Sequence, residues 1–323
     1  MVLFPFKVGK KPLLALMLSA LSVSPLLTQA ATVPAGTPLA AKQEVVRNNG
    51  SEPASLDPHK VESDVEFNII SDIFEGLVSV DNDGKIRPRL AERWENDNNT
   101  RWVFHLRLGL SWSNGDPITA QDVVYSWRRL VSPATASPYE SYLSNMHVLN
   151  AQAIIDGKKK PDELGIKALD DQTVEVSLDQ PISYFLQMLA HPALVPINKK
   201  DVEQFGDKWT QPANIVSSGD YKLEQWVVNE KVVAVRNSRY WDDAHTVVNK
   251  VTYLPVASGT ADVNRYRAGE IDVIYTVPET LFKSLKKELG PEVHARRSWR
   301  CITTNSIFRK RHSTIRGCGW RLI

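Results

Sequence analysis

The apolar positions of this chain follow two periods. In some stretches they alternate one by one with polar positions, and in others they recur every three or four residues. The first period is typical of half-buried strands and the second of amphipathic helices. Strand-like stretches cover residues 42–48, 101–112, 173–178, 221–237 and 249–256. Because the two kinds of stretch are mixed without strict alternation, we predict an α/β fold of mixed α+β character, in more than one lobe.

Capping residues mark the start of two predicted helices. Ser63 or Asp64 can cap the first, and Thr119 with Asp122 has the spacing of a capping box at the start of the second. The apolar face of the first helix consists of Ile69, Ile70, Ile73, Phe74 and Leu77. That of the second consists of Val123, Val124, Trp127, Leu130 and Val131. A third helix is predicted over residues 280–289.

Residues 1–30 have the pattern of a secretory signal peptide. Three lysines precede an apolar run from Leu13 to Leu27, and small residues follow at Ala30 and Ala31. The apolar run is short for a membrane anchor. We therefore expect an exported, soluble protein that begins near Ala31.

Charge is distributed unevenly along the chain. The formal net charge is +2, with +8 in residues 296–323 and +3 from the lysines before residue 31, which leaves −9 for residues 31–295. The whole-chain pI of about 8.4 therefore gives no reason to expect a nucleic-acid partner for the body. Both cysteines, Cys301 and Cys318, lie in the basic tail, so no disulfide framework can be read from the sequence.

The sequence contains no recognisable catalytic or metal-binding motif. None of the seven histidines has metal-ligand spacing, and there is neither a nucleophile elbow nor a phosphate-binding loop. We therefore predict a protein that is not an enzyme and needs no metal or cofactor. The aromatic residues between positions 94 and 142 could form a stacking surface, but Trp102, Phe104 and Trp127 occupy predicted core positions. Tyr139, in a Ser-Pro-Tyr loop, is harder to bury.

A series of motifs gives the chain a specific resemblance. In order they are RNNGSEPASLDPHK, DIFEGLV, LAERW, WVFHLR, WSNGDPITAQDVVYSWRRLVSPATASPY, SSGDYKLEQWVVNEK, RNSRYWDDA and RYRAGEIDV. They resemble the periplasmic oligopeptide-binding proteins of ATP-driven (ABC) importers, a branch of the extracellular solute-binding protein family 5. The resemblance extends over about residues 31–294, in order and with natural spacing.

The resemblance implies a periplasmic-binding-protein type II-like bilobal fold with an extra subdomain. Lobe I would consist of residues 31–74 plus 199–294, and the extra subdomain of residues 75–198. A family member of this kind encloses a short peptide between its lobes in the periplasm and delivers it to an inner-membrane ABC permease. It would act as a monomer.

The resemblance also implies four peptide-binding residues. Glu62, Ser63 and Asp64 match the family's strand that pairs with the peptide main chain, the feature that all peptides share. Tyr139 matches a tyrosine that lines the cleft in the extra subdomain. For Glu62 and Asp64 a purely structural explanation stays open, because a negative charge at the start of a helix is favoured by the helix dipole.

The tail at residues 295–323 departs abruptly from the family pattern. Permitted codons for these residues, read in a displaced frame, can spell PQLALYYYEFNLQKAPFNDPRVRMALN, which resembles the family's segment at this point. We therefore expect a frameshift near residue 295 and a second lobe missing from this chain. A cleft with one wall cannot bury most of a ligand, so we expect this chain to bind peptides weakly or not at all.

Three alternatives stay open. The chain could belong to a murein-peptide or other small-ligand receptor of the same family. It could be a secreted chaperone or interaction protein that uses an exposed half-cleft. Its basic tail could bind nucleic acid or a membrane, with strong dependence on salt.

Overall fold

The computed structural model describes residues 31–81, 83–295 and 305–307. The predicted signal peptide, both cysteines and nearly all of the predicted out-of-frame tail lie outside these residues. The described chain is a mixed α/β structure, as the sequence predicts. The division into lobe I and an extra subdomain stays a prediction.

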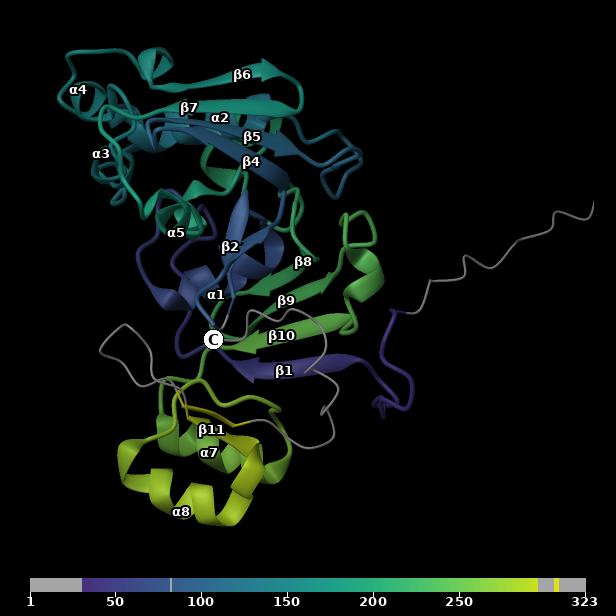
Figure 1. Ribbon diagram of the computed structural model, residues 1–323. Helices are drawn as coiled ribbons and strands as arrows, with labels where there is room; N and C mark the ends of the chain where they lie inside the picture. The colour runs from purple at the N-terminus through teal and green to yellow at the C-terminus, as the bar shows by residue number, and fades with distance from the viewer. Residues whose placement is uncertain (1–30, 82, 296–304, 308–323) are drawn as a thin grey trace, which may run out of the picture. The chain divides into compact units, whose positions relative to one another are not determined.

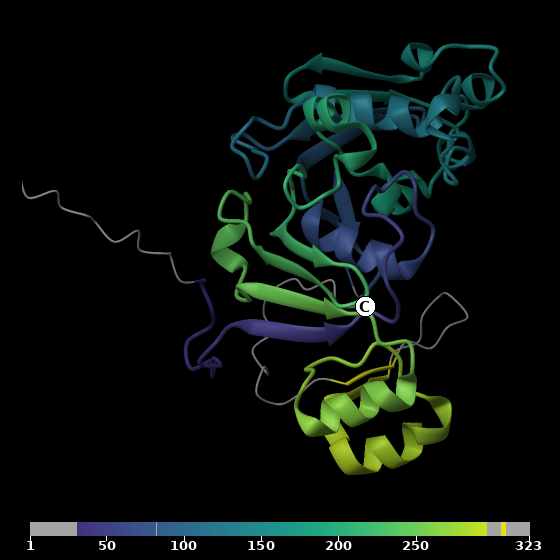
Figure 2. The ribbon, with the colours of Figure 1, turned by 180° about the vertical axis from the view of Figure 1, so that it is seen from behind.

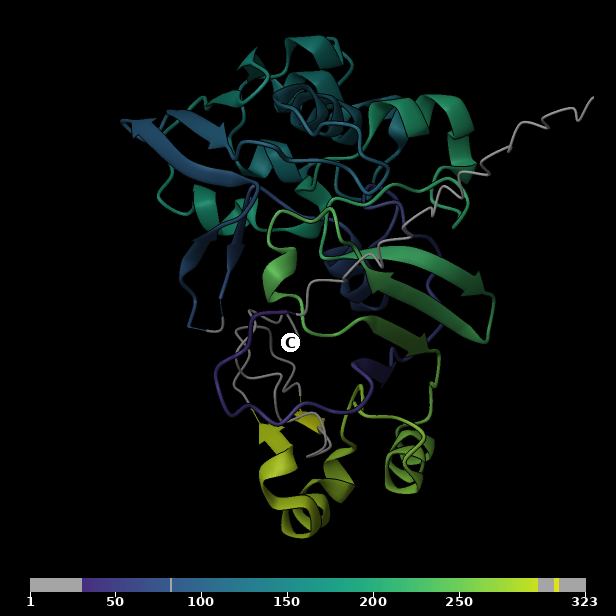
Figure 3. The same ribbon diagram turned by 90° about the vertical axis from the view of Figure 1, so that its right-hand side faces the viewer.

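A four-stranded sheet joins the first described strand to a segment about 200 residues later in the chain. Its strands are β1 (Glu44–Asn48), β8 (Tyr221–Val227), β9 (Lys231–Arg236) and β10 (Lys250–Leu254), in the order β1-β10-β9-β8 (Figure 1). β1 pairs with β10 in parallel, and the other pairs are antiparallel. Figure 3 shows the β8–β9 hairpin as two adjacent green arrows. All four strands lie in stretches that the sequence predicts as strands.

Helix α1 (Asp64–Ile73) packs against β8 and carries the first predicted apolar stripe. Ile69, Ile70 and Ile73 are fully buried. The helix ends one turn earlier than its apolar positions suggest, because Phe74 has extended backbone angles. The short hairpin of β2 (Val78–Val80) and β3 (Ile86–Pro88) follows.

A second four-stranded sheet is fully antiparallel, in the order β4-β5-β7-β6. Its strands are β4 (Ala91–Asp97), β5 (Arg101–Leu106), β6 (Ile166–Asp170) and β7 (Thr173–Ser177). Helix α2 (Ala120–Val131) packs on β6 and β7, and Trp102, Phe104 and Trp127 are buried, which confirms their predicted core role. The predicted strand over residues 101–112 is too long. It ends at Leu106, and a turn follows in which Gly109 has a φ of +73°.

Four short helices lie between β5 and β6 or after β7 along the described chain. They are α3 (Tyr142–Asn145), α4 (Ala151–Ile155), α5 (Phe185–Leu189) and α6 (Lys199–Phe205). Short 3-10 turns occur at Pro133–Thr135, Pro161–Glu163, Pro192–Leu194, Gly206–Lys208, Asp243–His245 and Gly290–Glu292. At the start of α2, the Asp122 carboxylate accepts the Thr119 amide at 2.8 Å, so the predicted capping pair is confirmed.

The last described part has a small core of its own. Helices α7 (Gly259–Ala268) and α8 (Glu279–Leu289) pack together around Val263, Ile274 and Leu285 (Figure 2). α8 matches the helix predicted over residues 280–289. The strands β11 (Val293–Ala295) and β12 (Asn305–Ile307) pair antiparallel.

Candidate functional site

The predicted peptide-pairing residues lie at the start of α1. Glu62, Ser63 and Asp64 are all exposed, and Ser63 has extended backbone angles (φ −102°, ψ 159°). Within the described part of the chain, neither the amide nor the carbonyl group of Glu62 has a backbone hydrogen-bond partner. An exposed, extended segment with unpaired backbone groups can accept a further strand. The geometry at Glu62 therefore suits main-chain recognition.

The buried carboxylate of Glu66 holds this segment from the protein side. Glu66 is 6% exposed, and its carboxylate accepts hydrogen bonds from the backbone amides of Ala54 at 2.9 Å and Ser63 at 3.2 Å. The Ser63 hydroxyl donates to the same carboxylate. Glu66 is thus the second member of a capping box that the sequence analysis did not identify. It fixes where the exposed backbone of residues 62–64 lies.

Asp64 lies in the first turn of α1 and also contacts a residue that is far away in the sequence. The hydroxyl of Tyr275 donates to Asp64 Oδ2 at 2.5 Å. Burial, and then the Asp64 carboxylate, raise the pKa of Tyr275, so the phenol stays protonated as a donor. The ligand role of Asp64 stays a prediction.

Tyr139 lies in a cluster of four rings. Its centroid is 5.7 Å from that of Phe67 and 4.7 Å from that of His191, and Tyr142 lies 4.7 Å from His191. Tyr139 is half-buried, as its loop position suggests. Phe67 follows Asp64 by three residues on α1 and contacts Tyr139 edge-on, so one helix connects the two predicted parts of the site. We call residues 62–64 together with these four rings the candidate surface.

Hydrogen bonds orient two of these rings. The Tyr142 hydroxyl donates to the carbonyl of Met188 at 3.1 Å. His191 Nδ1 accepts the Ala193 amide at 3.1 Å, which places the proton of the neutral imidazole on Nε2. Sequence reasoning missed Phe67, His191 and Tyr275 as members of the site. Only Phe67 had a readable signal, its helical spacing from Asp64.

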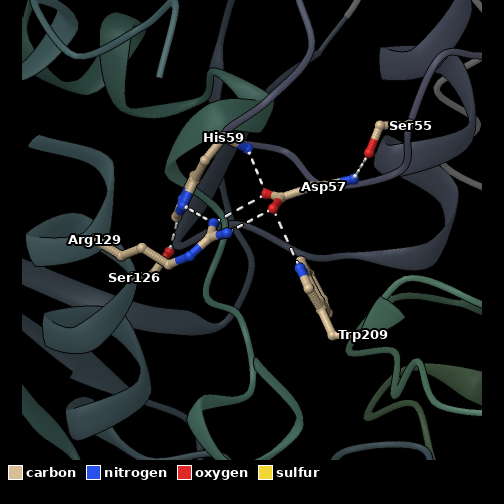
Figure 4. Close-up of polar contacts among 6 residues, drawn as sticks. All are labelled: Ser55, Asp57, His59, Ser126, Arg129 and Trp209. Carbon is tan, nitrogen blue, oxygen red and sulfur yellow. Dashed lines mark hydrogen bonds and ion pairs between the residues drawn. The ribbon is translucent and has the colours of Figure 1, made fainter. Parts of the chain in front are cut away.

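A separate buried polar cluster connects three distant segments (Figure 4). Arg129 on α2 forms a two-pronged ion pair with Asp57, with N–O distances of 2.6 and 3.0 Å. The indole of Trp209 donates to the same carboxylate at 3.2 Å. Burial alone would raise the pKa of Asp57, but Arg129 and the other donors outweigh it and lower that pKa. Asp57 therefore stays ionised inside the protein.

The same cluster contains the three kinds of side chain found in a Ser-His-Asp catalytic triad, but they are not arranged as in a triad. His59 is fully buried, and burial lowers its pKa to about 3. Arg129 can only donate, so its contact of 2.7 Å fixes His59 Nδ1 as an acceptor. His59 Nε2–H then faces Ser126 Oγ at 3.3 Å, and Ser126 donates to the carbonyl of Val195 at 2.6 Å. A catalytic histidine must instead accept the serine proton, so this chain of donors is structural.

The described residues lack two further kinds of feature. They include no group of three or more histidine, cysteine or acidic side chains placed to hold a metal ion. Within the same ranges, none of the helices has the length and apolar character needed to cross a membrane.

Comparison with known proteins gives consistent matches. Residues 85–310 match the family model "Bacterial extracellular solute-binding proteins, family 5 Middle". The periplasmic oligopeptide-binding protein OppA of Salmonella typhimurium is 54% identical over 287 residues, 88% of this chain and 53% of that protein. The chain therefore spans about half the length of the curated relatives it matches.

Solved structures of relatives share the fold. The crystal structure of Haemophilus influenzae OppA in complex with RPPGFSPFR matches with a TM-score of 0.78 and 49% identity, over 80% of this chain and 51% of that one. The Escherichia coli murein tripeptide binding protein MppA matches with a TM-score of 0.78 and 45% identity, over 80% of this chain and 51% of that one.

Proposed function

Because the chain belongs to the bacterial extracellular solute-binding proteins of family 5, we propose that it binds short oligopeptides in the periplasm for an ABC importer. It would reach the periplasm through residues 1–30 as a signal peptide. There it would act as a monomer, without a cofactor and without catalysis, and would deliver peptides to an inner-membrane permease. Relatives named as periplasmic oligopeptide-binding proteins support this proposal.

One observation carries the proposal for this chain. The exposed backbone at Glu62 has an amide and a carbonyl that pair with no backbone group among the described residues, and it lies beside a helix whose Phe67 contacts Tyr139. The backbone groups offer a peptide main-chain hydrogen bonds that do not depend on its sequence. The rings offer apolar contact to a side chain of the peptide. Because residues 62–64 are exposed, a ligand here stays largely solvated and is expected to bind weakly.

The test is an amide NMR titration of residues 31–323 with trialanine. We expect fast-exchange shifts at Glu62, Ser63, Asp64 and Phe67 and an affinity weaker than micromolar. Amides of α8 serve as the internal control and should not move. Absence of shifts at the candidate surface at millimolar peptide would contradict the proposal, and submicromolar binding would contradict the predicted weakness.

A murein-peptide receptor is the second candidate, because MppA is 45% identical over 87% of this chain. The same titration with murein tripeptide separates the two. Shifts at the candidate surface with murein tripeptide and none with trialanine would favour this second function.

A further inference from the structure

Residues 271–275 extend from the small core of α7 and α8 toward the candidate surface. The Asp272 amide donates to the carbonyl of Val46 at 2.7 Å, and Asp272 Oδ2 accepts the Val46 amide at 3.0 Å. The Asn48 amide then donates to the carbonyl of Val273 at 3.0 Å. Asp272 and Val273 therefore run beside β1, where Val273 forms a parallel bridge with Arg47, and Tyr275 follows two residues later.

Tyr275 is held at three points. Its backbone amide donates to Asp262 Oδ2 at 3.0 Å, and Asp262 is fully buried on α7. Its ring lies directly on Gly50: a Cβ atom added to Gly50 would come within 2.8 Å of the ring. Gly50 also has a φ of +85°, a conformation that favours glycine. The backbone contact and the ring contact leave the Tyr275 side chain little freedom.

The third point is the hydroxyl group, which donates to Asp64 Oδ2 at 2.5 Å. Asp64 is exposed, and the phenol gives its carboxylate a partner from outside helix α1. A rigidly held phenol therefore orients an exposed carboxylate next to Glu62 and Ser63. The contact connects residues far apart in the sequence, and the ring on Gly50 sets its geometry.

We infer that Tyr275 is a positioning residue for peptide binding: its hydroxyl, through Asp64 and together with the Glu66 carboxylate, holds the exposed backbone of Glu62 and Ser63 in the form that a peptide strand would pair with. This inference rests on the proposed function and adds to it a residue outside the family motifs quoted above. Pre-organisation of this kind improves affinity, because less backbone entropy is lost on binding.

The test compares Tyr275→Phe with Tyr266→Phe in residues 31–323. Tyr275→Phe keeps the ring on Gly50 and removes only the hydroxyl. Tyr266→Phe removes a hydroxyl in the same small core, where it donates to Glu292 at 2.5 Å, and serves as the matched control. Without ligand, Tyr275→Phe should shift the amides of residues 62–64 and speed their hydrogen exchange, whereas Tyr266→Phe should leave them unchanged.

Peptide binding supplies the second readout. Tyr275→Phe should weaken trialanine binding about 3- to 10-fold, the range that the net contribution of one typical hydrogen bond implies. Asp64→Asn keeps an acceptor for the phenol and should therefore weaken trialanine binding less. In the Asp64→Ala background, adding Tyr275→Phe should not change the affinity further. Equal affinities for Tyr275→Phe and Tyr266→Phe would overturn the inference while the proposed function stands. Failure of the parent protein to bind peptide would overturn both.

Discussion

At the scale of single residues, Asp262 shows how burial makes a carboxyl group sensitive to pH. It is fully buried, and its Oδ1 atom has no hydrogen-bond partner among residues 31–81, 83–295 and 305–307. Burial raises its pKa to about 6, against the opposing effects of the Asn48 side chain, the Tyr275 amide and the charge of Arg265. The ionised form is therefore disfavoured in the folded protein and not in the unfolded chain.

This raised pKa predicts a stabilising substitution. Between pH 4 and pH 6 the folded state binds more protons at Asp262 than the unfolded state does. The contribution of Asp262 to the free energy of unfolding therefore decreases as pH rises. The total loss is on the order of 2 to 3 kcal/mol. The free energy of unfolding of Asp262→Asn, measured with urea, should therefore equal that of the parent near pH 4 and exceed it by about that amount at pH 7.

The comparison must be made against the parent at each pH. His59, with its pKa lowered to about 3, makes the free energy of unfolding increase with pH, which is the opposite of the effect of Asp262. The reason is that His59 of the unfolded chain takes up a proton as pH falls below the ordinary pKa of histidine, whereas the buried His59 does not. The effect of His59 is common to both proteins and cancels in the difference. A difference between Asp262→Asn and the parent that does not vary with pH would show that the titration plays no part.

At the scale of elements, the joint between α1 and β8 depends on a glycine. The amides of Ser218 and Gly219 both donate to the carbonyl of Ile73, at 3.1 and 3.0 Å. A Cβ atom on Gly219 would lie 2.6 Å from the Asp72 carbonyl oxygen and 2.9 Å from the Phe74 amide nitrogen. Both neighbours are backbone atoms that cannot rotate away.

Gly219→Ala should therefore lower the free energy of unfolding by about 1 to 3 kcal/mol, the range for overpacking. Gly76→Ala, where the added carbon would make only an ordinary 3.4 Å contact, is the matched control and should change it much less. Thermal unfolding followed by circular dichroism measures both. Equal losses in the two variants would argue against the close contact at Gly219.

Elements with a clear apolar pattern could be predicted from the sequence, and those without one could not. α2 was predictable because its stripe is broad and Thr119 caps it, and β9 because its strand pattern is apolar. β4 was missed because only Ala91 of its seven residues is buried. α7 was missed because its buried positions are few and include the polar Asp262. A strand at a sheet edge and a polar helix carry too little apolar signal.

The same limit applies to the candidate surface. Glu62, Ser63, Asp64 and Tyr139 came from resemblance to a family, and their roles as ligand contacts stay predictions. Tyr275 approaches Asp64 through a tertiary contact across most of the chain, which no local pattern contains.

At the scale of the whole molecule, Arg129 and Asp57 join α2 to the segment before α1. Asp57 is 5% exposed, so removal of the guanidinium would leave a charge buried with too few partners. Arg129→Met should lower the free energy of unfolding by about 3 to 5 kcal/mol. Adding Asp57→Asn should recover part of this loss, because the uncompensated charge is then gone.

Arg101→Met is the control for the Arg129 experiment. Arg101 pairs with Glu175, but half of its side chain is exposed and Lys167 binds the same carboxylate. Its loss should cost under about 1 kcal/mol. Urea unfolding measures the free energy of unfolding of both variants. An Arg129→Met protein as stable as Arg101→Met would refute a structural role for the buried pair.

The parallel pairing of β1 with β10 has a consequence for the order of events during synthesis and refolding. Glu44 pairs with Lys250, so the strand synthesised first among those described has no neighbour in the sheet until most of the chain has followed. Contacts of such long sequence separation form slowly. Until then β1 stays an unpaired strand, and an unpaired strand edge is prone to aggregation.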